Sequence, residues 1–253
     1  MLTAEWLRAF APIGVFKGGD EFIASGASVF YYDEGLLWII TANHVLKIIG
    51  ELKHVSVLVG QAVGDHPTVV NLGELQGHLG ISWVIDDVND IAASLMPYSS
   101  DVNIQSMKRE NCLEFAELLP SMPCYTIGRP YSYRGVDPQS SLPLVLDGII
   151  AGVHKGKREI YTSAPTFPGN SGGPLIAIRR LAPRPGQPLR ALPTVFLAGI
   201  MLKTATVSPP SAANTLPNLH LGIARSFDAV IELLKSEQAK AQIKVALANT
   251  GSA

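Results

Sequence analysis

Most apolar residues of this chain lie in short runs that are separated by clusters of Gly, Pro, Asp and Ser. The runs are rich in Val, Ile, Leu and Tyr and occupy residues 27–32, 36–41, 55–59, 69–72, 91–95, 125–127, 144–153, 174–178, 194–202 and 219–224. Runs of this length between turn-forming residues are typical of β-strands. We therefore expect an all-β protein built as a sandwich or a barrel.

Three segments show helical features. Residues 3–9 and 111–119 are short candidates, and residues 227–248 are the strongest one. In the last segment apolar residues recur at helical spacing, and Ser226 precedes the first turn as a capping residue. We predict a C-terminal helix there. The proline-rich segments 179–193 and 208–217 are predicted to be surface loops, because proline cannot donate a hydrogen bond within a central strand.

The composition excludes several classes of protein. Of the 253 residues, 47% are hydrophobic and 16% are charged, so the chain can bury a core and does not resemble a disordered one. With 20 basic and 21 acidic residues it lacks the positive charge of a nucleic-acid-binding protein. No run approaches the roughly 18 apolar residues that cross a membrane. We therefore predict no nucleic-acid partner and no membrane partner.

The first ten residues show no signal-peptide pattern, because Glu5 and Arg8 interrupt the apolar residues. A cytoplasmic protein is expected, or a periplasmic or secreted one if a signal sequence has been removed. The two cysteines, Cys112 and Cys124, suit a reducing compartment. The residues alone leave open a single disulfide between them.

Residues 168–175 read PGNSGGPL and contain the strongest chemical signal. Ser171 stands between glycines, which adopt backbone angles that other residues cannot and let a carbonyl group approach closely. A serine hydroxyl needs an adjacent base to act as a nucleophile. An ordinary glycine-rich turn is the alternative interpretation, and it does not explain the two segments described next.

A histidine and an aspartate precede Ser171 in fitting contexts. His44 follows the apolar run 36–41 and a short bend, which places it at a strand end. Asp90 precedes an apolar run that would carry it inward, where a buried carboxylate needs a partner. Asp86 and Asp87 are competitors, and we interpret them as solvated loop residues. The order His, Asp, Ser is that of one type of catalytic triad.

The chain is similar to the trypsin-like peptidase superfamily, which has the chymotrypsin fold, and most similar to its bacterial Deg/HtrA-type branch. Residues 161–175, 125–130 and 148–152 resemble segments of that branch, and the resemblance covers about residues 20–230. It implies two six-stranded antiparallel β-barrels, at about 12–110 and 120–226, and the helix at 227–248 within one domain over 1–253. It further implies His44, Asp90 and Ser171 as the triad and the N–H groups of Gly169 and Ser171 as the oxyanion hole.

The chain also departs from the family pattern. Asn170 stands where zymogen-activated digestive members carry an aspartate, so that activation switch is not expected. We also expect no PDZ domain, which HtrA proteins carry after the protease.

Substrate binding is expected along the strand after the serine, at Ile200, Met201 and Leu202, with Ile223 on the opposite wall. No acidic residue falls in these stretches, so we predict a preference for small or medium apolar residues before the scissile bond. His54, His66 and His78 form no ligand motif, and no metal or other cofactor is predicted.

The sequence thus predicts a serine endopeptidase acting on protein or peptide substrates. The alternatives that remain open are a latent or partner-activated protease, with a regulatory protein partner, and a protein-binding scaffold with this fold.

Overall fold

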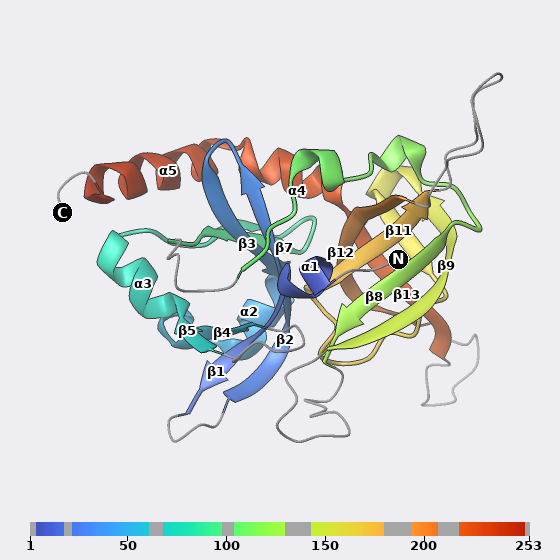
Figure 1. The fold of residues 1–253 in the computed structure, drawn as a ribbon, viewed down its shortest axis with the longest axis horizontal. Coiled ribbons are helices and arrows are strands. Elements are labelled where there is room, and N and C mark those ends of the chain that lie inside the picture. Colours follow the sequence, from blue (N-terminus) through green and yellow to red (C-terminus); the bar gives the residue numbers. More distant parts are fainter. Residues whose placement is uncertain are drawn as a thin grey trace.

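The structure is a computed structural model that describes residues 4–17, 22–60, 68–97, 104–129, 143–179, 194–206 and 218–250. Two β units lie side by side, and helices run along one side of both (Figure 1). Most of the two proline-rich segments, at 180–193 and 207–217, lies outside the described residues, as does His66.

The first unit is a seven-stranded antiparallel sheet in the order β5-β4-β1-β2-β3-β7-β6. Its strands are β1 (Phe10–Phe16), β2 (Phe22–Asp33), β3 (Leu36–Ala42), β4 (Val55–Val59), β5 (Thr68–Asn71), β6 (Val84–Asp86) and β7 (Ile91–Leu95). Glu34 and Gly35 join β2 to β3 with φ values of 47° and 86°, as a tight hairpin turn requires. The described strands of the first unit thus form an open seven-stranded sheet, where the sequence predicted a six-stranded barrel over 12–110.

The second unit is a closed six-stranded barrel in the order β10-β13-β12-β11-β8-β9. Its strands are β8 (Pro123–Gly128), β9 (Leu144–His154), β10 (Glu159–Thr162), β11 (Pro174–Arg179), β12 (Thr194–Thr206) and β13 (Asn218–Ser226). The all-β, chymotrypsin-like fold expected from the sequence is confirmed.

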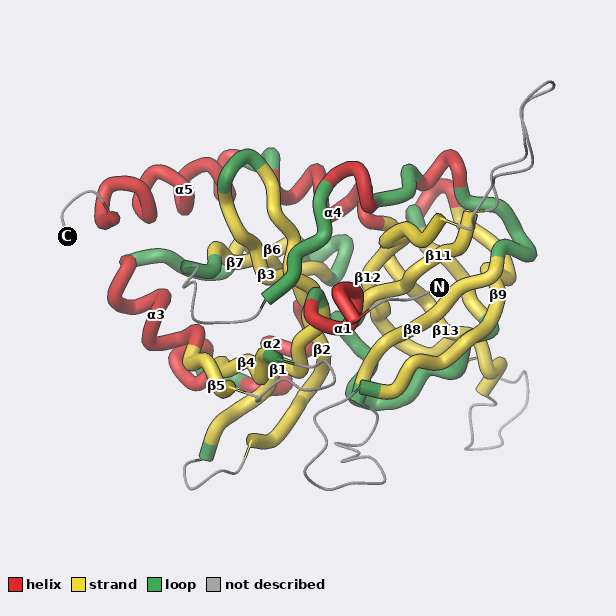
Figure 2. Tube along the Cα trace, viewed as in Figure 1, coloured by secondary structure: helices red, strands yellow, loops and turns green. Residues whose placement is uncertain are grey.

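The helices are short and lie mainly at the periphery of the two β units (Figure 2). They are α1 (Ala4–Arg8), α2 (Asn43–Ile49), α3 (Leu72–Leu79), α4 (Phe227–Leu234) and α5 (Glu237–Thr250). Single 3₁₀ turns occur at Leu52–His54, Arg109–Asn111, Phe115–Glu117 and Lys155–Lys157. The helix predicted over 111–119 is therefore wrong, since only two separate 3₁₀ turns form there.

The predicted C-terminal helix over 227–248 is divided into α4 and α5. The Ser236 hydroxyl accepts a hydrogen bond from the Ala239 N–H at 3.2 Å and so caps a new helix N-terminus. Ser226 precedes α4 as predicted, but its hydroxyl makes no capping bond. The Asp228 carboxylate in the first turn of α4 instead accepts a bond from the Phe115 N–H at 2.9 Å.

One hydrophobic cluster joins the two β units and α4. It contains Trp38 from the sheet, Leu197 and Ile200 from the barrel, and Phe227 from α4. The rings of Tyr31 and Phe227 meet edge-on with centroids 5.0 Å apart. The two units share this buried cluster and therefore pack against each other. The residues described next lie near this contact between the units.

Candidate active site

His44 is the second residue of α2, which begins directly after β3. The sequence predicted a bend here, and the segment is a helix. Strand β3 pairs with β7 so that Ala42 lies opposite Ile91. Because the strands are antiparallel, the segment that follows Ala42 lies beside Asp90, which precedes Ile91. His44 and Asp90 therefore become neighbours through strand register.

Asp90 contacts His44 with both of its carboxylate oxygens. Oδ2 lies 2.7 Å from Nδ1 of the imidazole, and Oδ1 accepts the His44 backbone N–H at 2.9 Å. The Asp90 carbonyl accepts the N–H of Asn43 at 3.0 Å. The first N–H groups of a helix lack partners within it, so Asp90 caps α2 while it orients the ring. Bonding at Nδ1 leaves Nε2 as the basic nitrogen.

The loop before Asp90, residues 87–90, is shaped by the two competing aspartates. The Asp86 carboxylate accepts bonds from the backbone and side-chain amides of Asn89, at 2.9 and 2.6 Å. Asp87 pairs with Lys47 at 2.7 Å and accepts a bond from the Asn43 side chain at 2.8 Å. Both therefore hold the loop in place and do not contact His44. Asp90 itself has φ 56°, a conformation that Asp tolerates better than most residues.

The pKa of the Asp90 carboxyl lies below its usual value. Burial is the largest single effect and would raise this pKa, but the hydrogen bonds and the charge of His44 together outweigh it. Asp90 is therefore an ionised acceptor that stabilises a positive charge on the imidazole.

Residues 167–173 form a turn around Ser171, the predicted nucleophile, and this turn is called the nucleophile turn below. The Asn170 N–H donates to the Phe167 carbonyl at 3.0 Å, Pro168 follows Phe167, and Gly169 has φ 101°. This is the pattern of a type II turn, which requires a positive φ at its third residue. Within the described residues, the N–H groups of Gly169 and Ser171 donate to no acceptor. Two unused donors on either side of a used one make a site for a negatively charged oxygen.

The nucleophile turn is hydrogen-bonded to both β units. The Ser171 carbonyl accepts the N–H of Ala27 in β2 at 2.7 Å, and the Gly172 N–H donates to the Met201 carbonyl in β12 at 2.7 Å. Gly172 has φ 85°, and a Cβ atom there would lie 2.1 Å from the Ala27 carbonyl oxygen. The glycines of the sequence motif therefore permit the close approach of the turn to the sheet.

The Ser171 hydroxyl donates to the Leu202 carbonyl at 2.7 Å, and it makes no hydrogen bond to His44. Leu202 has no partner in β13, because the register shifts between Met201 and Lys203. Such a bulge leaves an extra residue unpaired, which makes the Leu202 carbonyl available. Catalytic hydrogen bonds are often absent or long before substrate binds.

A cleft of about 280 Å³ contains both His44 and Ser171. Its described lining is Ser25, His44, Ile48, Thr166, Phe167, Pro168, Gly169, Ser171, Leu202, Lys203 and Thr204. None of these residues is acidic. Pro165 directly precedes Thr166 of this lining, and its carbonyl accepts a bond from the Thr126 hydroxyl at 3.4 Å.

The expected substrate-binding residues divide into two groups. All four residues are buried, but Leu202 lines the cleft, whereas Ile200, Met201 and Ile223 do not. The backbone of Met201 instead holds the nucleophile turn. Sequence reasoning did not single out Thr166, Phe167 and Thr204 as lining residues. Alternation along β12 was the available signal for Thr204, since it stands two residues after Leu202.

Other sites are not evident in the described part of the chain. No group of three or more His, Cys, Asp or Glu side chains there could hold a metal ion. None of the described helices has the length and hydrophobicity needed to cross a bilayer. Cys112 and Cys124 are both buried and free, so the disulfide left open by the sequence does not form in this structure.

Comparisons with known proteins bear on the family and the fold. A sequence profile of the trypsin-like peptidase domain matches residues 25–180. Among solved structures the chain is similar to the HtrA-type protease AlgW with tripeptide, at 20% identity and a TM-score of 0.54, over 93% of this chain and 62% of that one. A variant of AlgW with tripeptide matches at 20% identity and a TM-score of 0.51, over 91% and 60%.

At this identity the two structures bear on the fold alone, and the chain spans less than two thirds of their length. No relative was found among curated protein sequences.

Proposed function

Because the chain belongs to the trypsin-like peptidase family, we propose that it is a serine endopeptidase in which Ser171 is the nucleophile, His44 the base and Asp90 the orienting acid. The observation that carries the proposal is the contact between His44 and Asp90. One carboxylate oxygen of Asp90 lies 2.7 Å from Nδ1 of His44, and the other accepts the backbone N–H of His44 at 2.9 Å. These two bonds fix one orientation and one tautomer of the imidazole.

In the proposed reaction the Ser171 hydroxyl oxygen attacks the carbonyl carbon of the scissile peptide bond, and Nε2 of His44 takes its proton. The N–H groups of Gly169 and Ser171 bind the negative oxygen that forms, an effect worth roughly 3–4 kcal/mol per donor in a related type of site. His44 then gives the proton to the leaving amine, and an acyl ester remains on Ser171. Water, activated by His44, hydrolyses this ester.

Ser171 must leave the Leu202 carbonyl before it can attack. A peptide that adds to β12 as a further strand would offer its own backbone N–H to that carbonyl. Strand β11 pairs with β12 only as far as Ile200, and no other strand of the described residues covers that edge of β12 beyond it. We infer that substrate binding itself displaces the Ser171 hydroxyl and frees it for His44.

A preference for small or medium apolar residues before the scissile bond belongs to the same proposal. The described lining of the cleft has no carboxylate that would attract an Arg or Lys side chain. Thr166 narrows the cleft, since its carbonyl accepts the Thr204 hydroxyl at 3.1 Å. A digest of a peptide library tests this, and cleavage after Arg or Lys in excess of aliphatic residues would contradict it.

A fluorophosphonate probe, which reacts covalently with an activated serine, tests the nucleophile. Labelling of the wild-type protein that is lost in Ser171→Ala supports the proposal. Ser163→Ala is the matched control, because Ser163 is an exposed serine outside the cleft lining. Absence of labelling of folded wild-type protein would favour the latent or scaffold alternatives. Labelling that appears only when a peptide or protein partner is added would favour the partner-activated one.

A further inference from the structure

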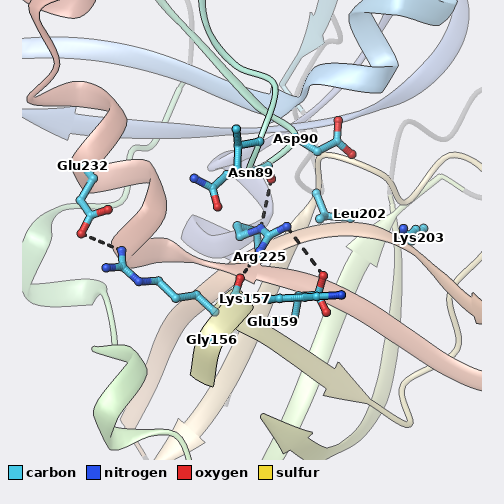
Figure 3. A pocket seen from close by; sticks show the side chains of 11 residues that line it. Asn89, Asp90, Gly156, Lys157, Glu159, Leu202, Lys203, Arg225 and Glu232 are labelled. Carbon is cyan, nitrogen blue, oxygen red and sulfur yellow. Dashed lines mark hydrogen bonds and ion pairs between the residues drawn. The ribbon is translucent and has the colours of Figure 1, made fainter. Parts of the chain in front are cut away.

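A second cavity, of about 530 Å³, adjoins the cleft on the side of Asp90 (Figure 3). Leu202 and Lys203 line both spaces, so the two are contiguous along β12. The remaining described lining comes from the loop before Asp90, from the turn between β9 and β10, from β13 and from α4: Val88, Asn89, Asp90, Gly156, Lys157, Arg158, Glu159, Arg225 and Glu232.

Every carboxylate in this lining already has a partner. Asp90 is bonded to His44. Glu232 pairs with Arg158 at 2.6 Å. Glu159, whose side chain is 12% exposed, faces Arg225 at 3.8 Å and also accepts a bond from the Tyr161 hydroxyl at 3.1 Å. The acidic residues of the cavity are thus neutralised by groups of the protein itself.

The basic residues are not all neutralised. In the part of the chain that the structure describes, neither Lys157 nor Lys203 has an acidic partner, and both are exposed. The two lysines come from different elements, the turn after β9 and the strand β12, and both face the cavity.

Arg225 holds the wall between these elements. Its side chain is 8% exposed, and its guanidinium donates to the carbonyls of Asn89 and Lys157, the former at 3.1 Å. Figure 3 shows the guanidinium directed at Asn89 and Glu159 beneath the cavity. Arg225 therefore connects the backbone of Lys157 to that of Asn89 in the wall of the cavity that Lys203 also lines.

We propose that this cavity binds an acidic side chain of the substrate, located two or four residues before the scissile bond. The inference rests on the proposed function, in which the substrate lies as a strand along β12. Side chains alternate between the two faces of a strand. The residue directly before the scissile bond enters the cleft near Thr166, so the second and fourth residues before the bond point to the other side, where the cavity with Lys157 and Lys203 lies.

The expected gain in affinity for an acidic peptide follows from the exposure of the two lysines. An exposed ion pair contributes about two- to fivefold in affinity, and two such pairs about tenfold. Salt screens exposed charges, so the preference should shrink between about 0.05 M and 0.5 M NaCl.

The test uses the Ser171→Ala protein, so that binding is measured without turnover. Fluorescent peptides carry a fixed apolar residue directly before the scissile bond and differ only by Glu or Gln at the second or at the fourth position before that bond. Their binding is titrated by anisotropy. We expect the Glu peptide of at least one pair to bind about tenfold more tightly. In Lys157→Gln/Lys203→Gln the ratio of the two dissociation constants should fall to about one. Lys155→Gln, on the same turn but outside the cavity, should leave the ratio unchanged.

Equal binding of the Glu and Gln peptides by the protein with both lysines, or no binding of either, overturns this inference. An unchanged ratio in the double lysine variant overturns the assigned residues. The proposed function fails separately, through absence of fluorophosphonate labelling in the protein that retains Ser171.

Discussion

At Gly172 a single methyl group would separate the nucleophile turn from the sheet. In Gly172→Ala the new Cβ atom would lie 2.1 Å from the Ala27 carbonyl oxygen and 2.3 Å from the Thr41 hydroxyl oxygen. Both atoms are buried, and the Thr41 hydroxyl already donates to the Ala27 carbonyl at 2.7 Å. Neither can move without disturbing β2 and β3, so the turn itself must shift.

The cost can be worked from the contacts. An alanine in the left-handed region costs roughly 1–2 kcal/mol. A shifted turn also loses the bonds from Ala27 to Ser171 and from Gly172 to Met201, each worth about 0.5–1.5 kcal/mol. We therefore expect the free energy of unfolding to fall by about 2–5 kcal/mol. A displacement of about 1 Å at Ser171 would slow acylation about 100-fold.

Urea unfolding and the rate of fluorophosphonate labelling measure the two effects. Gly152→Ala in β9 is the matched control, because nothing lies within 4 Å of a Cβ atom there and its φ lies outside the left-handed range. It should leave both quantities close to wild type. If Gly172→Ala unfolds at the wild-type urea concentration and is labelled at the wild-type rate, the described attachment of the turn to the sheet is wrong.

The remaining predictions concern three other sites. Asp90→Asn should slow labelling by roughly 10³–10⁴-fold, because the imidazole loses its tautomer and its counter-charge. Because the pKa of Asp90 is lowered in the folded state, its carboxylate stabilises the fold above pH of about 4, and this contribution is lost as the pH falls through the lowered pKa. Urea midpoints of wild type and Asp90→Asn should therefore converge in acid. Arg225→Met leaves the largely covered carboxylate of Glu159 without its cation and should destabilise the fold by about 3–5 kcal/mol, whereas Arg225→Met/Glu159→Gln should recover part of this in the same urea assay. Burial raises the pKa of the Cys112 thiol to about 12 and of the Cys124 thiol to about 11, so iodoacetamide at pH 8 should modify neither until urea is added, as mass spectrometry would show.

Local chemistry made much of the candidate site predictable. Ser171 can be recognised from its neighbours in the sequence alone. Gly169 and Gly172 adopt positive φ values that most other residues avoid, so the turn requires glycine at these positions. His44 and Asp90 were found because each borders an apolar run. The short strands could be predicted for the same reason, because hydrophobic runs and turn residues act within a few positions. The division into two β units was expected only from the resemblance to the peptidase family.

Contacts between distant segments depended on the tertiary structure. Only the register of β3 on β7 shows that Asp90 holds both the ring and the backbone of His44. The bulge at Leu202 decides that the serine hydroxyl lies on a backbone carbonyl. The burial of Ile200, Met201 and Ile223 follows from which face of each strand meets a core, which a shift of one residue would reverse.

The cavity beside Asp90 combines segments that lie up to 144 residues apart, from Val88 to Glu232. By itself the sequence determined which residues are candidates for hydrolysis, because the candidates are recognised from short motifs. The tertiary structure decided how those residues are oriented and what surrounds them, because register and packing depend on contacts between segments far apart in the chain.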